Sequence, residues 1–281
     1  MNLLLKNSKI LRILIINFKV KLFFRKYGSG KPLIIAHGLY GMSDNWLNIA
    51  KPLSEIYEVF LIDLRNHGNS PHSDEHSYPL ISQDIAEFLS ENSIKKASFV
   101  GHSMGGKAVM NFAFDFPQSV ENMIVVDISP RQYIFNEKEI AGYLNHYEIM
   151  KMMHRTEFNN FQTREQIEKH LSGFIPDTKI VKFLIKNIKR NSENKFEWKI
   201  NISALLRNFK KLFEEVGRPD DVFSGKTLFI KAENSPYISE ADTEIIKRKF
   251  PNSQIRTMPE CGHWVHYEKP AEMIEIISKF S

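Results

Sequence analysis

Cysteine and long apolar runs are both scarce in this sequence. Among 281 residues there is one cysteine, Cys261, so an intrachain disulfide is excluded and a reducing, cytoplasmic setting is expected. The apolar N-terminus is interrupted by Lys6, Lys9 and Arg12, and its longest unbroken apolar run covers only 13–16. That run is too short for a signal peptide or a membrane span, so we expect no stable membrane insertion.

The sequence also lacks metal-ligand spacings and nucleic-acid motifs. It has 10 histidines, but none forms an H-E-x-x-H pattern, and no metal is expected. The net charge is +5 and the pI is near 9.0, yet no nucleic-acid motif accompanies this charge. Lys, Asn and Ile are abundant throughout, so we attribute the basic balance to composition. With 42% hydrophobic and 25% charged residues, the chain is typical of a soluble globular protein.

Short apolar runs alternate with helical patterns along most of the chain. The runs that we expect to form buried strands are 33–36, 59–62, 97–100, 123–126 and 227–230. Helical patterns cover 46–54, 79–90, 105–116 and 271–280. This alternation indicates βαβ units and a mostly parallel sheet flanked by helices. Upstream, residues 18–24 alternate like a half-buried strand, with an edge strand leading into them.

One long segment interrupts that rhythm and predicts an insertion. Residues 131–218 contain no convincing buried strand, and patterns such as 179–190 favour helices, so we expect a helical cap over one end of the sheet. The core then consists of 1–130 and 219–281. Residues 179–211 hold ten Lys or Arg and two Glu, a formal charge of +8. They form either a solvated helix face or a basic rim for anionic substrates.

The stretch F-V-G-H-S-M-G-G-K-A-V-M at 99–110 carries the strongest chemical signal. It contains G-x-S-x-G, with Gly101, Ser103 and Gly105 between a predicted strand and a predicted helix. Such a strained turn exposes a nucleophilic hydroxyl, and the helix N-terminus behind it favours negative charge. We therefore expect Ser103 to be a nucleophile, the alternative being a purely structural glycine turn.

Acyl transfer also needs two donors for the developing oxyanion. The backbone N–H of Met104, the residue after the nucleophile, is one candidate. The other is the N–H of Leu39 in A-H-G-L-Y-G, which directly follows an early strand. His37 in the same loop is interpreted as a structural brace.

A candidate general base lies near the C-terminus. The strand Gln254–Met258 precedes a loop that carries His263 in C-G-H-W-V-H, and a helix follows Pro270. The order Ser then His is that of α/β-hydrolases. His266 is the alternative, but it lies closer to the helix and is expected to pack locally.

The acid that orients the base is not where such enzymes usually have it. The turn after strand 227–230 reads K-A-E-N-S-P-Y-I and offers Glu233 but no Asp. Asp127 ends the strand that follows the nucleophile helix, and neighbouring parallel strands bring their ends close together. We therefore assign the acid to Asp127, with Glu233 as the alternative. Asp63 also ends a strand, but its loop is expected to be structural, braced by its own Arg65 and His67.

With these motifs in place, the chain resembles α/β-hydrolases with a helical cap, and more narrowly the YbfF-type esterases and their ABHD11-type relatives. The resemblance rests on residues 37–46, 63–73, 101–110, 125–130, 234–240 and 262–270. It implies hydrolysis of esters or thioesters, including acyl-CoA-type substrates, without cofactor or metal. It also implies an acid at the position of Asp127.

These observations together predict a serine hydrolase that acts on small-molecule esters or thioesters through an acyl-enzyme. It would be a monomer or a small homo-oligomer, without a nucleic-acid partner. Two alternatives stay open: a cofactor-free C–C bond hydrolase with the same triad, and a catalytically silent relative that only binds. A haloalkane dehalogenase-like reaction is disfavoured because it needs Asp where this chain has Ser103.

Overall fold

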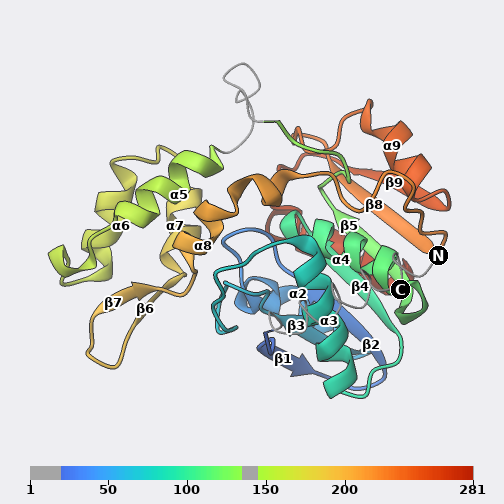
Figure 1. Ribbon diagram of the computed structural model, residues 1–281, viewed down its shortest axis with the longest axis horizontal. Coiled ribbons are helices and arrows are strands. Elements are labelled where there is room, and N and C mark those ends of the chain that lie inside the picture. Colours follow the sequence, from blue (N-terminus) through green and yellow to red (C-terminus); the bar gives the residue numbers. More distant parts are fainter. Residues whose placement is uncertain (1–19, 135–144, 281) are drawn as a thin grey trace, which may run out of the picture.

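A seven-stranded sheet forms the centre of the molecule (Figure 1). The computed structural model describes residues 20–134 and 145–280. The strands lie in the order β1-β3-β2-β4-β5-β8-β9, and all neighbours are parallel except β1 and β3. Their bounds are β1 Phe24–Tyr27, β2 Lys31–Ala36, β3 Tyr57–Ile62, β4 Ala97–His102, β5 Val120–Val126, β8 Lys226–Ala232 and β9 Ser253–Met258. The predicted α/β-hydrolase fold with its mostly parallel sheet is confirmed.

Side-chain alternation along the strands divides the core into two apolar layers. In β2, Ile34 and Ala36 face one layer, while Leu33 and Ile35 face the other. The first layer is covered by α3 (Tyr78–Glu91), α4 (Met104–Asp115) and α9 (Asp242–Lys249). The second is covered by α2 (Leu47–Leu53) and α11 (Pro270–Phe280). Both faces are buried, so the strands read as continuous apolar runs in the sequence.

The 18–24 strand prediction was wrong for most of its length. Among residues 20–24, only Phe24 belongs to a strand. That strand is β1, which pairs with β3 at the sheet edge. Before it, the Val20 N–H donates to Asp84 Oδ1 at 3.0 Å and the Phe23 N–H to Ser70 Oγ at 2.8 Å. Side chains therefore satisfy amides that a ladder would otherwise use. The predicted edge strand before residue 18 lies outside the described residues.

Within the predicted insertion, residues 146–207 lie as a lobe beside the sheet (Figure 1). Its described elements are α5 His146–Arg155, η3 Phe158–Asn160, α6 Arg164–Ser172, α7 Thr178–Ile185, β6 Ile188–Arg190, β7 Phe196–Trp198, α8 Ile202–Arg207 and η4 Phe209–Phe213. The helix predicted over 179–190 ends early, because residues 188–190 pair with β7 as a hairpin. Asn194, at φ 63°, turns the chain there, and Asn191 N–H donates to Lys195 O at 2.9 Å.

Both connections of the insertion are tied to the helix that follows Ser103. The two connections pair with each other, since the Val216 N–H donates to Pro130 O at 2.8 Å. The Lys107 ammonium of α4 donates to Arg131 O at 2.8 Å and also to Glu214 O. Lys107 is only 1% exposed, so these carbonyls replace the water that its charge would otherwise need.

Candidate active site

The ends of β4 and β5 place two of the predicted residues side by side. His102 and Val126 are register partners and the last residues of these strands. Ser103 and Asp127, which follow them, therefore lie next to each other at the edge of the sheet. The Ser103 N–H donates to Val126 O at 3.0 Å, and the Asp127 N–H donates to Ile230 O at 2.8 Å. The shared carboxyl edge of parallel strands is where ligands bind in such sheets.

Ser103 occupies a strained turn. Its φ of 53° and ψ of −118° lie outside the regions that L-residues prefer, and it caps the N-terminus of α4. The two motif glycines allow this turn because neighbouring backbone leaves no room for a side chain. A Cβ at Gly101 would meet Gly105 O at 2.4 Å, and one at Gly105 would meet Ala36 O at 2.4 Å. The turn holds Ser103 at the N-terminus of α4, where the first backbone N–H groups lack intrahelical partners.

Asp127 is joined to His263 by a hydrogen bond. His263 Nδ1 and Asp127 Oδ2 are 2.8 Å apart, and the carboxylate is fully buried. Asp127 Oδ1 accepts the Ala232 N–H at 3.0 Å, and Oδ2 also accepts the Ser235 hydroxyl. These donors stabilise an ionised carboxylate away from water. With its Nδ1 proton engaged, the imidazole leaves Nε2 for other chemistry.

Glu233 takes a different place. It is exposed and accepts the Glu260 N–H at 2.8 Å, at the surface of the turn. The serine of the same turn, Ser235, bonds Asp127 instead. Sequence reasoning assigned this serine no partner. The absence of Asp from the turn could have indicated this bond, because a serine hydroxyl here can donate to a carboxylate at the end of β5.

His263 is fixed by its neighbours on three sides. Its backbone carbonyl is 2.8 Å from His102 Nε2, and its ring stacks on Tyr237 with centroids 4.1 Å apart. The alternative base, His266, lies flat on Trp46, with centroids 4.4 Å apart and an interplanar angle of 11°. Burial, followed by the charges of His263 and Lys186, lowers the pKa of His266 to about 3.

The loop after β2 carries Leu39 and is braced by His37. His37 Nδ1 bonds Gly38 O at 2.8 Å, and Nε2 accepts the Leu64 N–H at 3.0 Å. The backbone donor requires an unprotonated Nε2, so the proton is on Nδ1. His37 is therefore a structural residue, as predicted.

The His67 ring braces the loop after β3, as predicted, because its Nδ1 bonds Arg65 O at 3.0 Å. Asp63 accepts the Ser43 N–H at 2.5 Å and the Asn69 N–H at 2.8 Å. Arg65 also reaches α3, where it forms a buried bidentate pair with Asp84 at 2.6 and 2.7 Å. The bidentate geometry suits a guanidinium that has no access to water.

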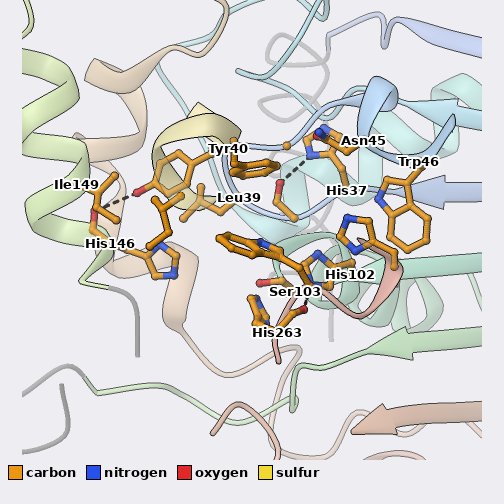
Figure 2. A pocket seen from close by; sticks show the side chains of 16 residues that line it. His37, Leu39, Tyr40, Asn45, Trp46, His102, Ser103, His146, Ile149 and His263 are labelled. Carbon is orange, nitrogen blue, oxygen red and sulfur yellow. Dashed lines mark hydrogen bonds between the residues drawn. The ribbon is translucent and has the colours of Figure 1, made fainter. Parts of the chain in front are cut away.

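Core and insertion together enclose the space in front of Ser103 (Figure 2). Figure 2 shows Ser103, His263 and Leu39 around one pocket, with His146 and Ile149 of α5 on its far side. Apolar walls and several histidines share the lining, which is His37, Gly38, Leu39, Tyr40, Gly41, Asn45, Trp46, His102, Ser103, His146, Ile149, Ile180, Phe183, His263, Trp264 and His266. A second small pocket brings Leu39, Ser103 and Met104 together.

Two further properties concern the described part of the chain only. Within residues 20–134 and 145–280, no group of three or more His, Cys, Asp or Glu is arranged to hold a metal ion. No helix in those same ranges has the length and apolarity needed to cross a membrane.

Comparison with known proteins agrees with this fold. The family model for the alpha/beta hydrolase fold matches residues 31–270. The chain is 33% identical over 252 residues to the sn-1-specific diacylglycerol lipase ABHD11 of Mus musculus, covering 88% of this chain and 80% of that protein. It is 30% identical over 254 residues to esterase YbfF of Escherichia coli, covering 90% and 93%. The solved structure of a marine microorganism esterase superposes with a TM-score of 0.90 at 38% identity, covering 94% and 100%.

The chain therefore belongs to the α/β-hydrolase family. Within it, the protein is of the type that esterase YbfF and ABHD11 represent, as the sequence motifs predicted. Its relatives include esterases and lipases.

Three buried histidines predict acid sensitivity. Burial is the main cause that lowers the pKa values of His76, His146 and His266 to about 3 each. Between pH 6.5 and about 3 the unfolded chain binds protons that the folded chain excludes, so the stability that these residues provide above pH 6.5 is lost as the pH falls. Each contributes a slope of about 1.4 kcal/mol per pH unit in that window.

Urea unfolding at pH 7, 6 and 5 measures this slope. His266→Phe keeps an aromatic ring against Trp46 and removes one titrating group, so its free energy of unfolding should fall less steeply with acid than the wild type. The exposed His154 provides the control, and His154→Phe should retain the wild-type slope. Equal slopes for His266→Phe and the wild type would contradict the assignment.

Proposed function

We propose that the protein is a serine hydrolase that cleaves carboxylic esters or acyl thioesters through an acyl-enzyme intermediate. The observation that carries the proposal is the 2.8 Å hydrogen bond between His263 and the buried Asp127, next to Ser103 on its strained turn. The names of the relatives, esterase and lipase, support ester hydrolysis. A pocket lined by Ser103, His263 and Leu39 supports a small-molecule substrate.

In the proposed mechanism, Asp127 holds the His263 imidazole with its proton on Nδ1. His263 Nε2 then removes the hydroxyl proton as Ser103 attacks the carbonyl carbon. The backbone N–H groups of Leu39 and Met104 hold the resulting oxyanion, and the N-terminus of α4 adds its dipole. The imidazolium protonates the leaving group. Water, activated by the same imidazole, resolves the acyl-enzyme.

We propose further that the insertion acts as a cap domain over 131–218, between core segments 1–130 and 219–281. Its support is the pocket lining, in which Ile149 and Ile180 of the insertion face the residues of the core. A cap of this kind shapes the acyl and leaving-group sites and excludes water from the reacting ester.

The basic face of the insertion supports thioesters with anionic leaving groups as one substrate class. Lys179, Lys182 and Lys186 are exposed and lie on one side of α7, the helix that also lines the pocket. The +8 already includes Glu193 and Glu197, which pair with Lys195 and Lys189. Two carboxylates from outside the segment neutralise it further, since Arg207 pairs with Asp74 and Lys211 with Glu75.

A fluorophosphonate tests the nucleophile. We expect one adduct per chain on Ser103, because the helix terminus and the base activate that hydroxyl, and Ser103→Ala should remain unlabelled. Intact-mass analysis of folded protein measures the adduct, and a panel of p-nitrophenyl esters measures turnover. An unlabelled wild type would favour the silent binder, whereas labelling without ester turnover would favour the C–C bond hydrolase.

Two isosteric substitutions test the acid. Asp127→Asn removes the acceptor that sets the imidazole tautomer, so we expect kcat to fall by about 10²–10⁴. Glu233→Gln should lower kcat by less than about tenfold, because the exposed Glu233 carboxylate accepts the Glu260 amide at the surface. Both variants are compared with the wild type by their thermal transitions first. An active Asp127→Asn beside a crippled Glu233→Gln would move the acid to the later turn.

Salt tests the anionic leaving group. If the α7 lysines attract it, KM for an acyl-CoA thioester should rise between low and high ionic strength, whereas KM for a neutral ester should not. Replacing Lys179, Lys182 and Lys186 by Gln should remove that salt dependence. Lys189→Gln is the control, because Lys189 already pairs with Glu197 at 3.1 Å. Equal salt dependence for both substrates would make this face a solvated surface only.

A further inference from the structure

Tyr40 is held in a conformation that needs support. It follows Leu39 in the oxyanion loop, and its φ of 61° is uncommon for an aromatic residue. Its side chain is only 3% exposed. Such strain persists only where surrounding contacts determine it, and it clusters at functional sites.

The contacts that hold Tyr40 come from the insertion. The Asn187 side-chain amide donates to Tyr40 O at 2.8 Å, and the Tyr40 hydroxyl donates to His146 O at 3.0 Å, drawn as a dashed line in Figure 2. One residue of the core loop is thereby held at its backbone and at the end of its side chain. The two holders come from different parts of the insertion, the α7–β6 turn and the start of α5.

Asn187 is itself immobilised for this contact. It is fully buried, its N–H donates to Leu184 O at 2.9 Å, and its carbonyl accepts the Lys199 N–H at 2.7 Å. Its side-chain Oδ1 is buried without a hydrogen-bond partner among the described residues. An unpaired buried amide oxygen costs stability, which the hydrogen bond from the amide nitrogen to Tyr40 O has to offset.

His146 also reaches the base side of the pocket. Its Nε2 lies 3.0 Å from the Tyr237 hydroxyl, a hydrogen bond, and the Tyr237 ring stacks on His263. The insertion therefore contacts both the loop that carries the Leu39 amide and the ring that packs against the imidazole.

We propose that Asn187 and His146 are positioning residues that assemble the oxyanion site, so that the docked insertion is required for the chemical step as well as for binding. The inference rests on the proposed function, in which the Leu39 amide is an oxyanion donor. Loss of one such donor lowers kcat by about 10²–10³. A displaced Leu39 amide should lower kcat by less than a removed one. The displacement is expected because Tyr40, once its contacts are lost, can relax and shift the adjacent Leu39 amide.

The test compares kcat and KM for a short p-nitrophenyl ester. Asn187→Leu removes the donor to Tyr40 O at similar volume, and Tyr40→Phe removes only the hydroxyl that reaches His146. We expect each to lower kcat by about 10–100-fold with KM changed by less than about threefold, because the oxyanion forms only in the transition state.

Asn208→Leu is the matched control. Asn208 also belongs to the insertion, is 7% exposed, and donates from its side chain to a core backbone carbonyl, Asp74 O, at 2.9 Å. Its contact lies away from the oxyanion loop. This variant should lose a comparable amount of thermal stability and keep kcat within about twofold. All rates are measured well below each variant's melting temperature.

A lower melting temperature with wild-type kcat in Asn187→Leu and Tyr40→Phe would overturn the inference and leave a purely structural contact. If Asn187→Leu does not fold, Tyr40→Phe decides alone, since it deletes a single hydroxyl. Ser103→Ala distinguishes a failure of the proposed function from a failure of this inference. An active Ser103→Ala would reject the proposed function itself, whereas an inactive one beside wild-type kcat in both other variants would reject only this inference.

Discussion

The buried carboxylate of Asp127 is the point on which the arrangement of the site depends. It stands at the end of β5 and accepts hydrogen bonds from His263, from the Ala232 amide at the end of β8, and from Ser235 in the following turn. A charge without water must be satisfied by protein donors. Three separate segments are therefore held at one place, and the imidazole is oriented as a consequence of folding.

A second constraint joins the insertion to the core. Lys107 lies one helical turn after Ser103 and bonds both connections of the insertion, so the nucleophile helix and the added lobe are tied together. The contacts at Tyr40 complete this coupling on the other side of the pocket. Because each group is buried, separation of the two parts would leave unpaired polar atoms on both. The insertion is better described as part of the site's framework than as an independent lid.

The departures from expectation have local causes. Arg65 was expected to brace its own loop, and it also forms a bidentate pair with Asp84, which is 19 residues away on α3. The 179–190 pattern is helical only to Ile185, because residues 188–190 form a hairpin with β7 that turns at Asn191 and Asn194. There, apolar periodicity indicated the helix but did not specify the hairpin that follows it.

By itself, the sequence determined the parallel sheet, the Ser103 turn, the His263 loop and Asp127 as an acid candidate. Those features follow from the alternation of strand and helix patterns, from the glycine spacing and from the positions of strand ends. Each of these patterns can be recognised in a short stretch of the sequence. The tertiary structure alone decided which donors surround Asp127, that Tyr237 stacks on His263, and that Asn187 holds Tyr40. The last pair is separated by 147 residues along the chain. Such contacts leave no local pattern, because they depend on how whole elements pack.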